Sequence, residues 1–249
     1  MEVEFLPNYM TYNGNMLFHY TRFESALKII STNQLLFGDF SKMNDISESS
    51  REVFNDLAEE ELKKYKSLSF TFDTKGKRAF EIDSLWGYYA EKGNGACLAF
   101  DRNKLFKEFN RFNDFHRRGK IQYLRNFTNA LFLSAKTRGE VVKEIETKYK
   151  DIFFTKSLDW TKENEYRLLT KNETLTPPFL NIEKALVAVI LCLPLQNEVE
   201  DSYEYNLLKK ITGVPILHYH TSLGNKTLTD IASKEPLWPL IGVDYQFAF

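Results

Sequence analysis

The segment Trp160-Thr161-Lys162-Glu163-Asn164-Glu165-Tyr166-Arg167 combines the alternation of a β-strand with three charged side chains. The pattern predicts a strand over residues 165–170. Because successive side chains of a strand point to opposite faces, Glu163, Glu165 and Arg167 are expected on one face. Two carboxylates beside an arginine can form a structural ion-pair network, and they can equally place one carboxylate against a ribose hydroxyl or a reacting water. The residues alone leave both interpretations open.

On both sides of this segment, short apolar strands alternate with stretches of helical spacing. Residues 16–21 predict a strand that runs directly into a helix over 22–33, where Thr21 and Glu24 have the spacing of a capping box. Further strands are predicted over 67–72, 96–100 and 186–193, and further helices over 50–66, 83–91 and 104–118. This order of elements predicts an α+β fold.

The composition is that of a globular protein rich in aromatic residues. Of the 249 residues, 43% are hydrophobic, 27% charged and 15% aromatic, which excludes a disordered chain. Lysine and arginine total 33 against 34 acidic residues, and the net charge of −1 excludes a basic field over the whole protein. No linker or repeat stands out, so a single domain over residues 1–249 is predicted, with residues 171–249 completing the fold.

The sequence also predicts a cytoplasmic protein with no membrane contact. Cys97 and Cys192 lie in apolar surroundings and are expected to be reduced and buried. The acidic N-terminal segment lacks the apolar core of a signal peptide. The longest apolar run, residues 185–195, is far shorter than the ~20 residues that span a bilayer.

One window of the chain is basic although the whole chain is nearly neutral. Residues 104–125 carry seven cations against Glu108 and Asp114, a local charge of +5. Phenylalanines at a spacing of three residues interleave with these cations, a combination that suits single-stranded nucleic acid. A helix with a buried phenylalanine face and a solvated basic face explains the window as well. The exposed cations proposed to contact nucleic acid are Arg111, Arg117, Arg118, Lys120 and Arg125.

Three further groups of residues have the chemistry of a binding site. His19 ends the first predicted strand, where its ring can donate a fixed hydrogen bond to a ligand or to a local backbone carbonyl. Trp86 and Tyr89 share a helix face and form either an aromatic wall for a flat ligand or part of the core. The polar loop over residues 44–48 carries two carboxylates that turn chemistry also explains. His218 and His220 share a strand face and could hold a metal, but no third ligand of fitting type stands nearby, so no metal site is expected.

Taken together, these motifs resemble the DUF2971 family, a domain family of unknown function. The resemblance covers about residues 16–170 and rests on the order and spacing of short motifs. These motifs are His19-Tyr20-Thr21, Asn44-Asp45 with Glu48, Trp86 with Tyr89-Ala90, Gly95, and Trp160 with Glu163, Glu165 and Arg167.

The order of motifs also resembles the ADP-ribosyltransferase superfamily. That resemblance implies split mixed or antiparallel sheets with flanking helices, which bind NAD between two small sheets. It implies that His19 bonds the nicotinamide ribose, that Tyr89 or Tyr88 stacks on the nicotinamide ring, and that Glu165 stabilises the oxocarbenium-like centre. Glu163 would orient the acceptor nucleophile. The other residues that the resemblance places around NAD are Tyr20, Thr21, Asn44, Asp45, Glu48, Trp86 and Arg167.

The function expected from this resemblance is an ADP-ribosyltransferase-like enzyme with NAD as substrate and a protein or nucleic acid as acceptor. The resemblance implies that such an enzyme acts as a prokaryotic toxin or a phage-defence effector. Two alternatives stay open at this stage. The first is a nucleic-acid-binding effector that uses residues 104–125, and the second is a non-catalytic sensor or scaffold that retains the fold.

Overall fold

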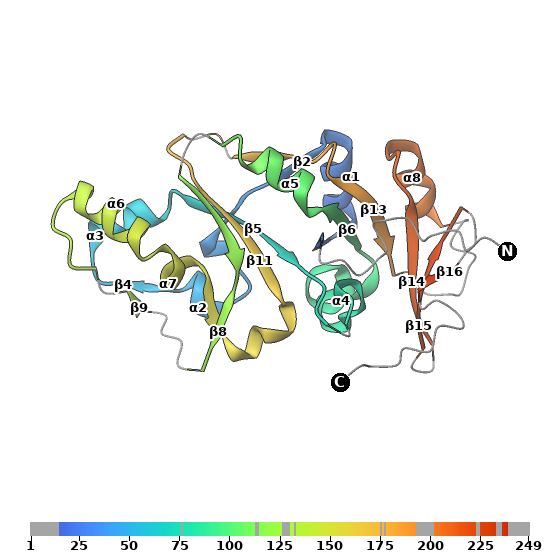
Figure 1. The fold of residues 1–249 in the computed structure, drawn as a ribbon, viewed down its shortest axis with the longest axis horizontal. Helices are drawn as coiled ribbons and strands as arrows, with labels where there is room; N and C mark the ends of the chain where they lie inside the picture. The colour runs from blue at the N-terminus through green and yellow to red at the C-terminus, as the bar shows by residue number, and fades with distance from the viewer. Residues whose placement is uncertain are drawn as a thin grey trace. The chain divides into compact units, whose positions relative to one another are not determined.

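The computed structural model describes residues 15–75, 77–112, 115–125, 130–131, 133–174, 176, 178–192, 202–222, 225–232 and 236–238. The chain divides into two compact units, which are described separately (Figure 1). Unit 1 comprises residues 1–33, 73–104 and 183–249, and unit 2 comprises residues 34–72 and 105–182. Both units combine helices with β-sheets, which confirms the α+β class. The prediction of a single domain stays a prediction.

Unit 1 is built on a mixed sheet with the strand order β16-β15-β14-β13-β6-β1. The central strands β13 and β14 pair in parallel, and the other pairs are antiparallel. The strands are β1 (Met16–Thr21), β6 (Ala96–Asp101), β13 (Leu186–Leu191), β14 (Ile216–Ser222), β15 (Asn225–Asp230) and β16 (Pro236–Trp238). The helices are α1 (Phe23–Thr32), α4 (Asp83–Tyr89) and α8 (Tyr203–Ile211), with short 3-10 turns η2 (Ala79–Glu81) and η3 (Glu91–Gly93).

Alternation along β1 sorts its side chains between two faces of this sheet. Met16, Phe18 and Tyr20 pack in one apolar cluster with residues of α4. The end of β1 approaches the turn after α4 so closely that Gly95 has room for hydrogen only. A Cβ at Gly95 would lie 2.4 Å from the carbonyl oxygen of Thr21. The glycine of the motif is therefore required by this contact between backbones.

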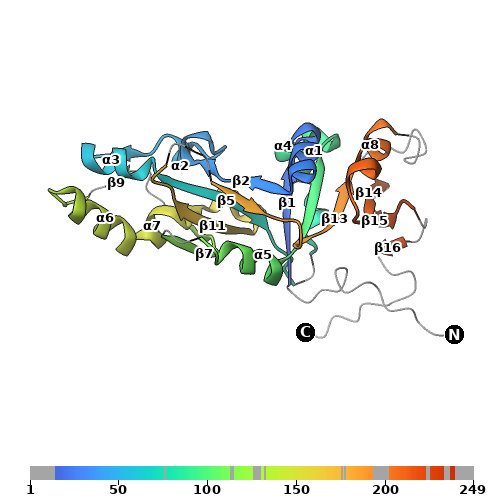
Figure 2. The ribbon, with the colours of Figure 1, turned by 90° about the horizontal axis from the view of Figure 1, so that it is seen from above.

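Unit 2 is built on an antiparallel sheet with the strand order β3-β5-β11-β7, of which β5, β11 and β7 can be followed in Figure 2. These strands are β3 (Gly38–Asp39), β5 (Tyr65–Thr71), β11 (Glu165–Lys171) and β7 (His116–Lys120). Three smaller strand pairs join β2 (Gln34–Leu36) to β12 (Phe179–Asn181), β4 (Glu52–Val53) to β9 (Ala130–Leu131), and β8 (Gln122–Leu124) to β10 (Thr155–Ser157). The helices are η1 (Phe40–Lys42), α2 (Ile46–Ser49), α3 (Asp56–Leu62), most of α5 (Arg102–Phe109), α6 (Arg138–Thr147), α7 (Tyr149–Phe153) and η4 (Leu158–Glu163).

The predicted helix over 104–118 is wrong beyond Phe109. Helix α5 ends there, and His116–Lys120 form strand β7 instead. The phenylalanines do not share one face, because Phe109 and Phe112 pack on Phe37 whereas Phe115 packs against Tyr65. Cross-strand pairing with β11 therefore overrides the helical spacing.

The predicted boundaries of two other helices are also corrected. Helix α1 is confirmed, but its N-cap is Arg22 and no side chain caps it. The backbone N–H of Phe23 is instead bonded by the carboxylate of Glu91, so the capping box of Thr21 and Glu24 is not formed. The helix predicted over 50–66 shrinks to α3, because the chain forms β4 before it and β5 after it. Within the described residues, no helix is long and apolar enough to cross a bilayer.

Candidate functional site

Strand β11 carries Glu165 and Arg167 on one face, as the alternation predicts. Glu163 lies two residues before the strand, in the 3-10 turn η4 rather than on the strand itself. Asn164 joins the two elements in a left-handed conformation with φ 43° and ψ 53°. Asparagine tolerates this conformation better than most residues. The turn at Asn164 lets both glutamates reach one cluster of charges.

Arg167 is the centre of that cluster and has 0% exposed surface. Its Nε donates to Oε1 of Glu165 at 2.7 Å, and its Nη2 donates to Oε2 of the same carboxylate at 3.0 Å. Its Nη1 donates to Oε1 of Glu48 at 2.6 Å and to the backbone carbonyl of Phe153 at 2.6 Å. The planar guanidinium thus holds two carboxylates from distant parts of the sequence, as its fork of donors allows.

Lys156 on β10 is the second cation of the cluster. Its Nζ lies 2.8 Å from Oε2 of Glu163, 2.8 Å from Oε2 of Glu165 and 3.2 Å from Oε2 of Glu48. Each of these side chains is at most 9% exposed. We call Glu48, Lys156, Glu163, Glu165 and Arg167 the ion cluster. It gathers three carboxylates and two cations in a dry site, where charges interact strongly.

The ion cluster fixes the protonation state of Glu165. Burial alone would raise the pKa of this carboxyl group, but Arg167 and Lys156 outweigh the burial and hold the pKa well below its usual range. Burial likewise opposes the charge of Lys156, and the three carboxylates raise its pKa above the usual value. Ser69 also donates to Oε1 of Glu165 at 2.6 Å. Glu165 is therefore an ionised carboxylate at neutral pH.

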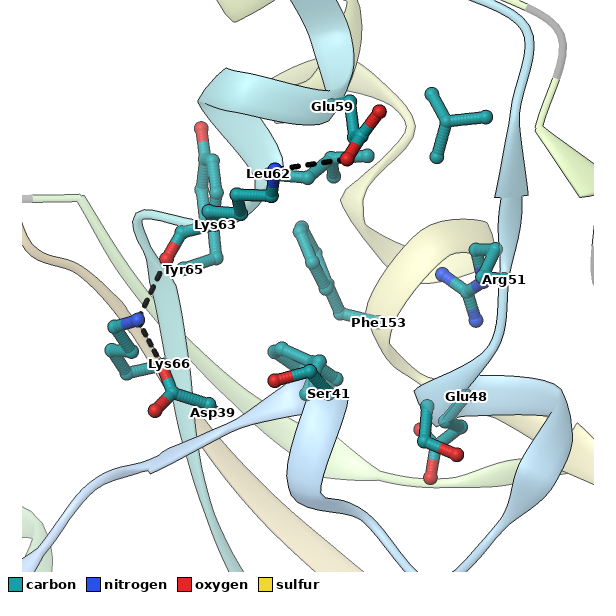
Figure 3. Close-up of a pocket in the computed structure, with 13 residues that line it drawn as sticks. Asp39, Ser41, Glu48, Arg51, Glu59, Leu62, Lys63, Tyr65, Lys66 and Phe153 are labelled. Carbon is teal, nitrogen blue, oxygen red and sulfur yellow. Dashed lines mark hydrogen bonds and ion pairs between the residues drawn. The ribbon is translucent and has the colours of Figure 1, made fainter.

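A pocket of about 290 Å³ adjoins the ion cluster and shares Glu48 with it. The rings of Phe40, Tyr65 and Phe153 line the pocket, and Arg51 enters it from the same side as Glu48 (Figure 3). Its volume is at the lower end of the range of about 300–1,000 Å³ for small-molecule pockets. Apolar rings with a few convergent charges are the usual composition of a ligand site.

Two ion pairs and a buried cation supply the charge of the pocket. Lys63 lies 2.8 Å from Glu59, and Lys66 pairs with Asp39. Arg51 donates to the carbonyl of Ile152, and burial lowers the pKa of its guanidinium. The pocket therefore offers flat apolar surface beside cations, which suits a planar ring that carries an anionic group.

The motif residues of unit 1 form a separate, largely apolar arrangement. The hydroxyl of Tyr20 donates to the carbonyl of Ala79 at 2.6 Å, and its ring meets Trp86 edge-on at 5.1 Å. Trp86 is 3% exposed and stacks on Tyr219 at 5.9 Å. Trp86 is thus part of the core of unit 1. This agrees with the interpretation of Trp86 as a core residue rather than as an aromatic wall for a flat ligand.

The remaining motif residues of unit 1 are more accessible. Tyr88 is 68% exposed and meets the half-buried Tyr89 edge-on at 6.4 Å. His19 and Thr21 are half-buried and project from β1 on the face opposite to Tyr20. Because these residues belong to unit 1 and the glutamates to unit 2, their union in one cleft stays a prediction.

A comparison with protein families places the motifs in context. Residues 85–168 match DUF2971. The model of this family is described as "Protein of unknown function (DUF2971)", and the match confirms the resemblance over about a third of the 249 residues. A comparison with curated proteins finds no match.

The DUF2971 match includes only part of the ion cluster. Lys156, Glu163, Glu165 and Arg167 lie within the matched residues, whereas Glu48 lies before them. Within the loop that carries Glu48, Asp45 is 3% exposed and Asn44 is exposed. This loop is in part the short helix α2 (Ile46–Ser49), which carries Glu48 in its first turn, while Asp45 directly precedes the helix.

Sequence reasoning identified the carboxylates and Arg167 but missed Lys156, Ser69 and Arg51. A signal for Lys156 exists, since only Thr155 separates it from the apolar run 152–154. A lysine within a buried stretch is almost always paired. Ser69 and Arg51 carry no such signal, because only the register of β5 and the path of the chain after α2 bring them here.

The residues of the basic window are spread over several elements of unit 2. Arg117, Arg118 and Lys120 are exposed on β7, and Arg125 is exposed just after β8. Arg111 follows α5 and forms an ion pair with Glu108. The structure therefore brings three of the five predicted cations together on one strand.

Proposed function

We propose that this chain is an ADP-ribosyltransferase-like enzyme that takes NAD as its substrate. The observation that carries the proposal is that the carboxylates of Glu163 and Glu165 share Lys156 next to a ligand-sized pocket, and that Glu165 is held ionised. When nicotinamide leaves NAD, positive charge develops on the ribosyl carbon. A carboxylate that is ionised in advance stabilises this charge without reorganisation of solvent.

The pocket supports the same proposal because its lining suits the binding of a substrate such as NAD. The rings of Phe40, Tyr65 and Phe153 offer flat surface for a nucleobase or nicotinamide ring. Lys63 and Lys66 line the pocket as cations, and a phosphate would bind them by replacing Glu59 and Asp39 as their partners. Glu48 links the pocket to Glu165, because both carboxylates bind Arg167 and Lys156.

The proposal makes one structural demand. Glu165 is 3% exposed and both of its oxygens accept hydrogen bonds within the protein. For Glu165 to meet a ribosyl group, Oε2 must exchange its contact with Lys156 for one with the substrate. Lys156 would then move toward Glu163, which it already contacts.

The test is NAD turnover in the variant Glu165→Gln, measured as nicotinamide release. We expect a loss of about 100-fold or more, the usual cost of removing a group that stabilises charge in the transition state. Glu61→Gln is the matched control, since Glu61 is equally buried in unit 2 and pairs with Lys64 and Lys171 outside the pocket. A folded Glu165→Gln protein that releases nicotinamide at the wild-type rate would exclude the proposal.

The hydrogen bonds within the ion cluster favour a second candidate function, a sensor that binds a nucleotide without converting it. The observation in its favour is that the protein itself already satisfies both oxygens of Glu165. A ligand of the native state raises the melting temperature by mass action. Stabilisation by NAD, ADP-ribose or nicotinamide with no release of nicotinamide would support the sensor over the enzyme.

A further inference from the structure

The edge of the unit 2 sheet carries a second surface, which lies apart from the ion cluster. Arg118 and Lys120 lie two residues apart on β7 and share a face of the sheet. Tyr166 of β11 is directly opposite Lys120 in the register, and therefore lies on the same face. Glu165 and Arg167 alternate with Tyr166 along β11, so the ion cluster occupies the opposite face.

Aromatic rings and cations alternate on this surface at contact distance. The guanidinium of Arg118 lies 4.3 Å from the ring centre of Phe106, which stacks on Tyr166 at 5.4 Å. The ammonium of Lys120 lies 4.4 Å from the ring centre of Phe72. We call Phe72, Phe106, Arg118, Lys120 and Tyr166 the β7 surface. Its three rings are half-buried, and its two cations are exposed.

The cations of this region differ from the other cations of unit 2. Lys64, Lys66 and Lys171 each pair with a carboxylate. In the part of the chain that the structure describes, no carboxylate lies within 4.0 Å of the charged nitrogens of Arg117, Arg118, Lys120 or Arg125. Among the described residues, no carboxylate therefore neutralises the positive charge of β7, which suits an anionic partner.

The strand also has the right position for a long ligand. In the described residues, β7 pairs with β11 on one side and is the last strand of the sheet on the other (Figure 2). A chain of phosphates can follow such an edge, while unstacked bases lie on rings or on guanidinium planes. Arg117 extends the charge to the other face of β7, where it lies 4.2 Å from the ring centre of Phe115.

We propose that the β7 surface binds single-stranded nucleic acid, with Arg118 and Lys120 on phosphates and the rings of Phe72 and Tyr166 against bases. The proposal does not rest on the activity proposed for Glu165. A protein partner with acidic side chains would use the charges alone, whereas unpaired bases would use both the charges and the rings.

The binding experiment uses the full chain and fluorescence anisotropy of labelled thymidine or uridine oligonucleotides of about 15 nucleotides. We expect Arg118→Gln with Lys120→Gln to weaken binding at least tenfold and to lower the salt slope by about two, since each lost phosphate contact lowers it by about one. Lys143→Gln with Lys150→Gln is the matched control. It removes two exposed cations from α6 and α7 of the same unit, and it should leave the affinity within about twofold of the wild type.

A second comparison separates base stacking from charge. Phe72→Leu should weaken binding about fivefold or more, because stacking on one aromatic ring contributes that much per base. A duplex of the same length and a heparin fragment, which has no bases, should bind more weakly than the single strand. The proposal is overturned by the absence of binding at low salt, by equal losses in the β7 and control variants, or by equal affinity for heparin.

Discussion

Arg167 shows how a single residue can organise a buried site. The side chain has no exposed surface, and its donors reach Glu165, Glu48 and the backbone of Phe153. Burying one unpaired charge is very costly, so such a residue persists only with its partners in place. Each partner in turn depends on Arg167, because a buried carboxylate without a cation is equally unfavourable.

Replacement of Arg167 should therefore destabilise the protein far more than loss of an exposed arginine. We expect Arg167→Met to lower the free energy of unfolding by about 3–5 kcal/mol, because it leaves the three buried carboxylates of the ion cluster with Lys156 alone. Arg138→Met is the comparison, since Arg138 is 68% exposed and its one ion pair with Glu61 spans 3.4 Å. Its cost should stay below about 1 kcal/mol. Urea unfolding of both variants measures the difference, and equal costs would contradict the role given to Arg167.

The low pKa of Glu165 predicts how stability depends on pH. In the folded chain this pKa lies below the ordinary value of 4.5. At a pH between the folded pKa and the ordinary pKa, the carboxyl group therefore binds a proton more readily in the unfolded chain than in the folded chain. The stabilisation is fully present above about pH 4.5 and is lost as the pH falls toward the folded pKa. Glu165→Gln should show a smaller loss of stability than the wild type between pH 7 and about pH 3 in urea unfolding. Identical pH profiles of the two proteins would show that Glu165 does not titrate in this way.

At the scale of elements, strands were more predictable than helices. Strands β1, β6, β11 and β13 follow from short apolar or alternating runs whose pattern coincides with their burial. The helix over 104–118 failed because its phenylalanines find partners in different parts of unit 2. No local pattern contains those partners, since they depend on the pairing of β7 with β11.

The same limit applies to the candidate site. Glu163, Glu165 and Arg167 could be grouped from sequence because they are close along the chain. Glu48, which lies 119 residues before Arg167, could be singled out from its polar loop but not grouped with Arg167 by any local pattern. Lys156 was missed because nothing local to β10 indicates that three carboxylates face it.

The junction between η4 and β11 depends on the left-handed conformation of Asn164. We expect Asn164→Gly to change stability by less than about 0.5 kcal/mol, because glycine adopts this conformation without strain. Asn164→Val should cost about 1–3 kcal/mol, because a β-branched side chain is strained there. Thermal or urea unfolding of the two variants provides the measurement, and a neutral Asn164→Val would show that the junction tolerates another backbone conformation.

For the whole molecule, near-neutrality conceals a strong separation of charge. The net charge is −1, yet unit 2 holds both a dry cluster of paired charges and an edge strand whose cations have no carboxylate nearby among the described residues. The paired charges stabilise structure and the edge charges remain available. Overall composition therefore gives no guide to which role a given lysine or arginine has.

The two cysteines provide a measure of how unit 1 opens. Cys97 is fully buried, and burial raises the pKa of its thiol, while burial raises the pKa of Cys192 to about 11. Since the thiolate is the reactive form, both should react slowly with a disulfide reagent in the native protein at pH 8. Both should react at once in urea. Rapid labelling of Cys97, which is fully buried, without denaturant would show that unit 1 opens readily under native conditions.

The discontinuous path of the chain has a consequence for the order of folding during synthesis. Unit 1 begins first, but its strand β6 pairs with β13, which is translated only after residue 182 completes unit 2. Domains generally fold as units as the chain leaves the ribosome. Unit 1 is thus the first unit to be translated in part and the last to be completed. While the ion cluster of unit 2 assembles, β1 and β6 have one edge without its partner strand.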